Sequence, residues 1–121
     1  MNYRDKMSDE TKKEFDGCIS RMAALDDVEA IYLFGSYACG VPHEDSDFDL
    51  YVIVKNTCKK EIRVAEKLYS VVNDSGLRFD ILVSNIRNFD ARSKTGRATL
   101  DKMVREKGVL LHGDTGLFGV A

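Results

Sequence analysis

Alternation of apolar and polar residues predicts the strands of this chain. The clearest pattern runs from Phe48 to Lys55. Successive side chains of a strand point to opposite faces of a sheet. One face would carry Phe48, Leu50, Val52 and Val54, and the other Asp47, Asp49, Tyr51 and Ile53. Shorter runs of β-branched, aromatic and aliphatic residues predict three further strands, at Ala30–Phe34, Leu77–Val83 and Val109–His112.

Helical spacing of apolar residues predicts the remaining elements. Ser8 is a suitable N-cap for a helix that runs to about Leu25, with acidic residues in its first turn. Two more amphipathic segments, at about Cys58–Ser75 and Ser93–Lys107, are each followed by a glycine. For the first of these two we expect the core face to carry Ile62, Ala65, Leu68, Tyr69 and Val72. A short helix is expected to start at Ser36.

The order of these elements indicates the fold class. Strands separated by helices predict a small mixed β-sheet flanked by helices, an α/β (α+β) fold. A chain of 121 residues is the size of one domain, and neither a repeat nor an internal boundary is visible in residues 1–121. We therefore expect a single domain.

Composition and charge narrow the classes of function. Eighteen basic and twenty acidic residues give a net charge of −2, so non-specific nucleic-acid binding is disfavoured. Three cysteines without metal-ligand spacing favour a reducing compartment over a disulfide framework or a zinc site. The charged N-terminal segment lacks the apolar stretch of a signal peptide, and no apolar run approaches the length of a membrane span. We expect a cytoplasmic protein without a membrane partner, and a homo-oligomer is compatible with this composition.

The first candidate for chemistry is the junction at Gly35 and Ser36. A strand that ends in Gly-Ser permits close approach of a ligand to the backbone, because glycine has no Cβ. A helix that starts at Ser36 would present free N–H groups and a hydroxyl to an anion. These two residues therefore suit a phosphate group. The segment Gly40–Ser46 that follows the short helix contains turn formers and the only proline, and we expect a loop there.

The second candidate is a set of three aspartates. Asp47 and Asp49 are two residues apart at the start of a strand, so both carboxylates should point to one face. Asp80 lies within the apolar run Phe79–Val83, where an unpaired buried carboxylate would be costly. Bound Mg²⁺ would offset all three charges, since it takes oxygen ligands and bridges carboxylates to phosphates. Two such ions would suit in-line nucleotidyl transfer.

Together these motifs resemble a known family. The strings LFGSYACG and SDFDLYVIV, followed by the aspartate of FDILV, are similar to the minimal nucleotidyltransferases of the DNA polymerase β-like superfamily. The resemblance covers Ile31–Val83 most closely and extends more weakly through REKGVLLHG. It implies that Gly35 and Ser36 hold the triphosphate of a nucleotide and that Asp47 and Asp49 ligate Mg²⁺. It also implies that Asp80 helps to ligate Mg²⁺ and activates the acceptor.

One position departs from the family pattern. Family members often carry a basic residue where this chain has Cys39, and a thiol cannot contact phosphate as arginine does. The loss would lower nucleotide affinity unless another cation, such as Arg92, Lys94 or Arg97, takes its place. We expect Cys39 itself to pack as a small residue rather than to act as a reactive thiol.

Each motif also has a structural interpretation. Gly35 and Ser36 alone fit a turn with a helix cap, Asp47 and Asp49 alone fit a solvated strand entry, and Asp80 alone fits a buried acid paired with a cation. An Asp-x-Asp motif also occurs in sugar-nucleotide glycosyltransferases, although the small size and the Gly-Ser helix start argue against that class. The combination, in this order and on these strands, is what favours a nucleotidyltransferase.

The resemblance implies a reaction and a partner. The expected reaction transfers AMP from ATP to a hydroxyl, with Mg²⁺ as cofactor and release of pyrophosphate. Minimal domains of this family are often paired with a HEPN-type toxin that they neutralise by nucleotidylation, so a HEPN-type protein is the expected partner and acceptor. The alternative is a binding module that has kept the fold, lost activity, and neutralises its partner by forming a complex.

Overall fold

The computed structural model describes residues 3–39, 47–58 and 60–113. The predicted loop Gly40–Ser46 lies outside the described residues, as do the two ends of the chain. The elements follow in the order η1 (Tyr3–Lys6), α1 (Asp9–Ala23), β1 (Val28–Phe34), α2 (Gly35–Cys39), β2 (Phe48–Val54), α3 (Glu61–Val72), β3 (Phe79–Asn85), α4 (Ile86–Ser93), α5 (Leu100–Lys107) and β4 (Val109–His112). This is the predicted mixed sheet flanked by helices.

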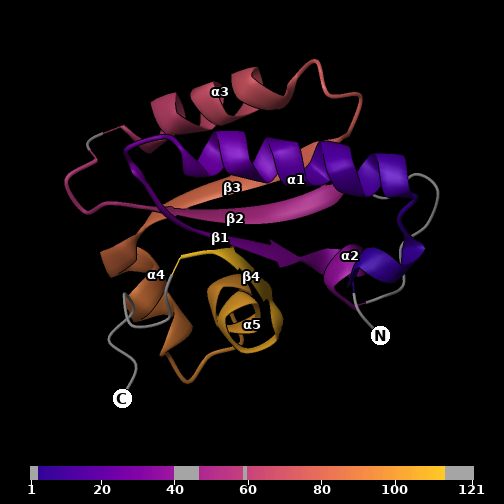
Figure 1. Cartoon of the computed structure of the whole chain (residues 1–121). Helices are drawn as coiled ribbons and strands as arrows, with labels where there is room; N and C mark the ends of the chain where they lie inside the picture. Colours follow the sequence, from indigo (N-terminus) through magenta and orange to yellow (C-terminus); the bar gives the residue numbers. More distant parts are fainter. Residues whose placement is uncertain (1–2, 40–46, 59, 114–121) are drawn as a thin grey trace.

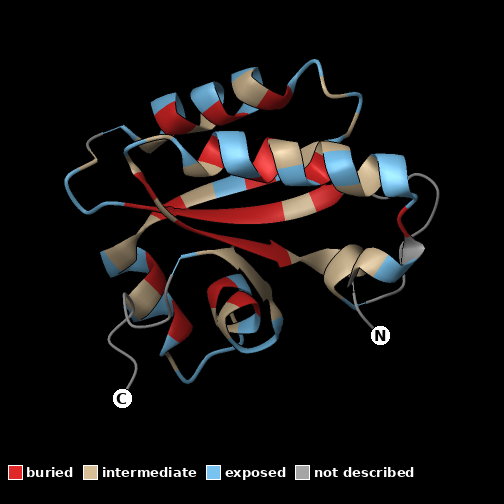
Figure 2. Ribbon diagram, viewed as in Figure 1, coloured by how far each residue is buried: buried red, intermediate tan, exposed pale blue. Residues whose placement is uncertain are grey.

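The sheet has the strand order β3-β2-β1-β4. β1 pairs antiparallel with β2 and with β4, whereas β2 and β3 are parallel. α1 and α3 cover one face of the sheet, and α4 and α5 lie against the other (Figure 1). The two central strands, β1 and β2, are therefore buried along most of their length (Figure 2).

Each face of β2 contributes to a different hydrophobic core, as the alternation predicts. Its first set of apolar residues packs under α1 and α3, and its second set packs against α4 and α5. The first set is Phe48, Leu50, Val52 and Val54, and the second is Tyr51 and Ile53. Burial on both faces fixes the register of β2, because a slip by one residue would exchange the two sets.

The helix caps explain where several elements begin. The Ser8 side chain accepts a hydrogen bond from the Thr11 N–H at 3.1 Å, which confirms the predicted start of α1. Asn85 and Thr99 cap α4 and α5 in the same way, accepting from Asn88 N–H and Lys102 N–H. The predicted single helix Ser93–Lys107 is therefore wrong. Ser93 ends α4, and α5 starts at Leu100, because the intervening residues include Gly96 and the Thr99 cap.

The prediction for α3 needs a second correction. The helix spans Glu61–Val72 rather than Cys58–Ser75, and its buried residues are Val64, Leu68 and Val72. Ile62, which was expected to face the core, is 71% exposed. The predicted segment has eighteen residues and the helix only twelve. The expected core face is also wrong at Tyr69, which is 41% exposed. β3 also begins two residues later than predicted, at Phe79, and extends to Asn85.

Candidate active site at the ends of three strands

The predicted site residues come together where β1 ends and β2 and β3 begin. The parallel register of β2 and β3 pairs Asp49 with Asp80, so the two residues are neighbours across the strands. The antiparallel register of β1 and β2 pairs Asp49 with Phe34, the residue directly before Gly35. Three elements that are far apart in sequence thus bring two of the aspartates and the Gly-Ser junction to one end of the sheet.

The charges of the three aspartates act on one another. Burial raises the pKa of the Asp49 carboxyl, and the nearby charges of Asp80 and, to a smaller extent, Asp47 raise it further. Asp49 is half-buried, whereas Asp47 and Asp80 are exposed. Nearby like charges disfavour ionisation of the Asp49 carboxyl. A cation between the carboxylates would remove that penalty.

The expectation that Asp80 is a buried acid is wrong. β3 is an edge strand, and the face that carries Asp80 and Leu82 is not covered by α4 until Ser84, which is buried. The cost of burying an unpaired carboxylate therefore does not apply to Asp80. What connects Asp80 to the site is its register with Asp49 and the charge that it exerts on Asp49.

Gly35 makes the closest approach in the site. Its φ is +77°, a left-handed conformation that favours glycine. A Cβ at this position would lie 2.0 Å from the Asp49 carboxylate oxygen Oδ2 and 2.9 Å from its Cγ. Both the backbone conformation and the space therefore exclude a larger residue, and the absence of a side chain lets the Asp49 carboxylate lie directly against the backbone.

The short helix α2 starts at Gly35, one residue before the predicted start at Ser36, and is held against β2 by aromatic packing. The rings of Tyr37 and Phe48 are stacked with their centroids 4.1 Å apart. Ser36 is half-buried at the second position of the helix. With five residues, α2 is little more than one turn, so its dipole is small. Phosphate binding by Gly35 and Ser36 stays a prediction.

The carboxylates of the site fit Mg²⁺ only together with ligands from a substrate or from water. Among the described residues, no group of three or more His, Cys, Asp or Glu side chains could hold a metal ion by itself. Asp47 is instead paired with Arg78, with Nε 3.2 Å from Oδ1, and both side chains are largely exposed. However, Mg²⁺ is usually held by one or two carboxylates together with substrate phosphates and water. Asp49 and Asp80 supply two carboxylates, and Asp47 could join them by leaving Arg78.

The cations proposed from the sequence are largely engaged elsewhere. Arg92 donates through Nε to Asp101 at 3.3 Å and through a terminal nitrogen to Ser84 at 2.7 Å. Lys94 pairs with Asp90, one helical turn earlier. Arg97 makes no ion pair within the described part of the chain. Cys39 is exposed rather than packed, which corrects the expectation for that residue.

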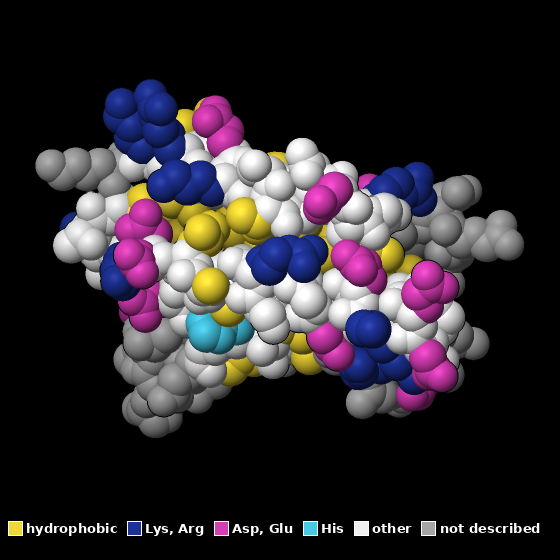
Figure 3. All heavy atoms as spheres, turned by 45° about the horizontal axis from the view of Figure 1, so that its top comes forward, with side chains coloured by type: hydrophobic (Ala, Val, Ile, Leu, Met, Phe, Trp, Pro, Cys, Tyr) yellow, Lys and Arg dark blue, Asp and Glu magenta, His cyan; other side chains and the backbone are white. Residues whose placement is uncertain are grey.

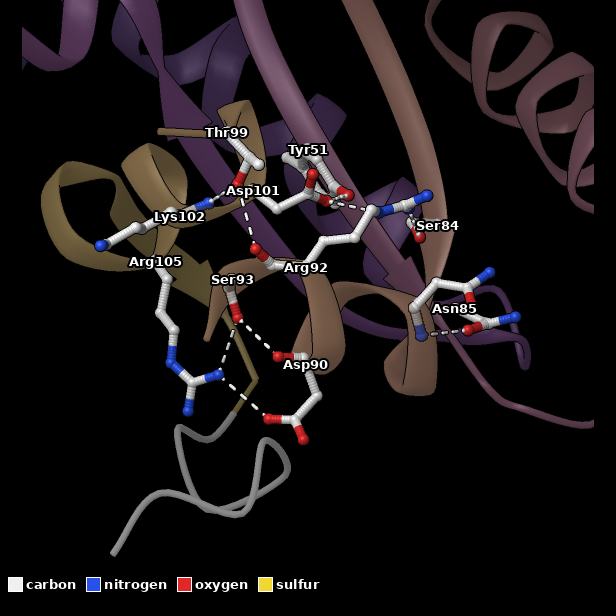
Figure 4. A network of polar contacts seen from close by, with 11 residues as sticks. Tyr51, Ser84, Asn85, Asp90, Arg92, Ser93, Thr99, Asp101, Lys102 and Arg105 are labelled. Carbon is white, nitrogen blue, oxygen red and sulfur yellow. Dashed lines mark hydrogen bonds and ion pairs between the residues drawn. The ribbon is translucent and has the colours of Figure 1, made fainter. Parts of the chain in front are cut away.

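A polar network behind the site was not predicted. The Tyr51 hydroxyl donates to the buried Asp101 carboxylate, which also accepts from Arg92 (Figure 4). Tyr51 follows Asp49 by two residues on the same face of β2, and Asp101 belongs to α5. Burial and the Asp101 hydrogen bond raise the pKa of Tyr51 to about 12. The network ties α4 and α5 to the two strands that carry Asp49 and Asp80. An acid at the second position of a helix after a Thr cap was its only sequence signal.

The face formed by α1 and α3 shows a mixed charge distribution. Lysine and arginine side chains alternate with acidic ones across it, with patches of hydrophobic surface between them (Figure 3). No single sign of charge dominates this view of the molecule.

In the described ranges, no helix has the length and apolar character needed to cross a membrane. All three cysteines are free thiols.

This sheet brings carboxylates at neighbouring strand starts beside a Gly-Ser helix junction. Residues 17–107 match the family model described as polymerase beta, nucleotidyltransferase. The chain belongs to this family and is a nucleotidyltransferase, as the sequence resemblance implied.

Similar proteins refine this assignment. The chain is 35% identical to "Putative protein adenylyltransferase MJ0141" of Methanocaldococcus jannaschii over 74 residues, which are 61% of this chain and 72% of that protein. It is 44% identical over 61 residues to "Putative protein adenylyltransferase MJ1305" of the same organism, covering 50% of this chain but only 42% of that protein. A crystal structure of a toxin-antitoxin with AMP-PNP has the same fold, with a TM-score of 0.52 and 23% identity over 86% of this chain and 77% of that one.

Proposed function

We propose that this nucleotidyltransferase transfers AMP from ATP to a hydroxyl group of a protein partner and depends on Mg²⁺. The observation that carries the proposal is the pairing of Asp49 with Asp80 across parallel strands, with Gly35 packed against the Asp49 carboxylate. This arrangement concentrates negative charge at one point, which favours a divalent cation. The names of the two Methanocaldococcus relatives support an adenylyl group and a protein acceptor.

Each site residue has a role in this reaction. Asp49, which is half-buried and lies against Gly35, would be the primary metal ligand. Asp80 is exposed on the edge strand, so a macromolecular acceptor can reach it; it would complete the metal site and orient the acceptor hydroxyl. Asp47 would contribute after releasing Arg78, and Gly35 and Ser36 would contact the triphosphate. When bound, Mg²⁺ would neutralise phosphate charge and stabilise the attacking and leaving oxygens.

The bond changes follow from this assignment. The acceptor oxygen forms a bond to the α-phosphorus of ATP, and the bond from that phosphorus to the bridging oxygen of the β-phosphate breaks. Pyrophosphate leaves with the bonding electrons, and the hydroxyl proton passes to the surrounding water or to a carboxylate of the site. Chain residues supply positioning and electrostatic stabilisation, which are the main contributions in phosphoryl-type transfer.

The partner is proposed to be a HEPN-type toxin in the cytoplasm. Support comes from the family resemblance and from the similarity of fold to a toxin-antitoxin structure with AMP-PNP. Residues 1–121 are proposed to form the single domain that carries this site.

A second candidate is neutralisation by binding alone. Two observations favour it: Cys39 supplies no charge to the site, and Asp47 is already paired with Arg78. The two candidates differ in what Asp49 does. In the enzyme, Asp49→Asn abolishes transfer and neutralisation together. In the binding module, the same substitution leaves neutralisation intact.

Transfer can be tested with ATP labelled at either the α- or the γ-phosphate. The protein is incubated with Mg²⁺ and the product of the neighbouring reading frame, and the label on protein is measured after electrophoresis. We expect the α-label on the partner and no γ-label, with loss of labelling in Asp49→Asn. Asp74→Asn, an exposed residue after α3, is the matched control and should label normally. Labelling from the γ-phosphate, or unchanged labelling by Asp49→Asn, would contradict the proposal.

A further inference from the structure

A small hollow lies between the end of β1, the helix α2 and the last turn of α5. Gly35 and Cys39 line it from one side, and Met103 and Lys107 from the other. Its volume is about 40 Å³, room for roughly three water molecules. It is thus too small for a nucleobase. Its significance is that Lys107 and Gly35, the residue that contacts Asp49, line the same hollow.

The position of Lys107 is fixed by the chain around it. Gly108 ends α5, where its N–H donates to the Val104 carbonyl at 2.8 Å. A Cβ on Gly108 would lie 2.5 Å from that carbonyl oxygen and 3.3 Å from the Leu33 carbonyl oxygen, so the end of α5 sits directly against β1. β4 then pairs Val109 with Leu33. The end of α5, with Lys107 directly before Gly108, is thereby held near the end of β1, where Gly35 begins α2.

Lys107 differs in its partners from Arg92, Lys94 and Arg105. Arg92 is paired with Asp101, and Lys94 and Arg105 are both paired with Asp90. Lys107 is exposed and makes no ion pair within residues 3–39, 47–58 and 60–113. Lys107 is thus an exposed cation in the lining of a hollow that Gly35 also lines. The other side chain at this point, Cys39, provides no charge.

We propose that Lys107 binds the polyphosphate of the nucleotide. The inference rests on the proposed function, because a triphosphate held at Asp49 and Gly35 would lie beside the hollow that Lys107 lines. Lysine is a compact cation with three donors on a flexible stem, which suits contact with phosphate oxygens without a fixed geometry. Lys107 supplies the positive charge that residue 39 lacks. In the sequence, this substrate-binding residue is far from Gly35 and Ser36.

The test is equilibrium dialysis of labelled ATP in the presence of Mg²⁺, which measures the dissociation constant without any acceptor. Lys107→Met removes the charge and keeps the apolar stem. We expect it to weaken ATP binding about tenfold or more, as for a lost hydrogen bond to a charged group. Lys107→Arg should restore binding to within about threefold of the original protein, because it keeps the charge. Added salt should weaken the original protein more than Lys107→Met.

Lys102→Met is the matched control. It removes the same charge from the same helix, but Lys102 does not line the hollow beside Gly35. Equal affinities of Lys107→Met and Lys102→Met would overturn the inference and leave the proposed function standing. Failure of Lys107→Arg to bind better than Lys107→Met would also overturn it, because charge would then not be the cause. If the unmodified protein does not bind ATP with Mg²⁺, the proposed function fails and this inference fails with it.

Discussion

Replacing Gly35 by alanine tests the contact on which the whole site depends. The substitution has two separate costs. An alanine at φ +77° carries a backbone penalty of about 1–2 kcal/mol. In addition, its Cβ would start 2.0 Å from the Asp49 carboxylate oxygen, so this oxygen must move by about 1 Å to reach a separation that real side chains show. Displacements of about 1 Å in an active site can lower activity about a hundredfold.

Gly76 provides the control for the first of these costs. Its φ is +79°, almost the same as that of Gly35, but a Cβ there would meet no atom within 4 Å. Gly76→Ala should therefore lower the free energy of unfolding in urea by about 1–2 kcal/mol, the backbone penalty alone, and should keep the transfer activity. Gly35→Ala should lose at least as much stability and about a hundredfold in transfer rate. Equal activity of the two variants would refute the argument that the Asp49 carboxylate is held in place by the missing side chain of Gly35.

Three further predictions follow from the charges of the site and its support. Because the pKa of Asp49 is raised in the folded state, ionised Asp49 destabilises the fold above that pKa. Asp49→Asn should therefore raise the melting temperature at pH 7 in EDTA, and this gain should vanish in acid. The same substitution should remove any stabilisation by Mg²⁺. Tyr51→Phe leaves the buried Asp101 without its hydroxyl donor and should lower the free energy of unfolding in urea by about 1–3 kcal/mol. This difference should shrink from about pH 10 to 12, because the pKa of Tyr51 is raised in the fold and the phenol contributes stability only while it is protonated. Arg78→Met removes an exposed ion pair worth at most about 1 kcal/mol, so the free energy of unfolding should hardly change. Mn²⁺ binding, measured by titration, should tighten by up to about fivefold because Asp47 is released. Weaker Mn²⁺ binding would mean that Arg78 supports the site.

Much of the fold follows from periodicity. The alternation in β2 assigned Leu50 to one core and Tyr51 to the other because both faces of this strand are buried, and the structure confirms the division. The same alternation placed Asp49 on the face opposite Leu50. Periodicity fails at α4 and α5, because the apolar pattern around Val104 continues back through the residues between the two helices, whereas the cap at Thr99 starts α5 at Leu100.

The details of the site depend on tertiary structure that a local pattern does not contain. Asp80 is exposed because β3 lies at the edge of the sheet, and strand order is not encoded in the residues around Asp80. The contact of Gly35 with Asp49 arises from the register of two antiparallel strands. Likewise, Lys107 reaches the site only because β4 pairs with β1. The sequence identifies which residue types are available, whereas their separations and partners require the assembled sheet.

Asp49 and Asp80 are proposed to hold a divalent cation together with the phosphates of a nucleotide. The most direct test of this proposal is Mn²⁺ binding measured by electron paramagnetic resonance in the presence of a non-hydrolysable ATP analogue, since Mn²⁺ takes the same oxygen ligands as Mg²⁺. We expect a bound Mn²⁺ signal in the unmodified protein and in Asp74→Asn, and a dissociation constant at least about tenfold weaker in Asp49→Asn. The same dissociation constant in Asp49→Asn and in the unmodified protein would contradict the proposal.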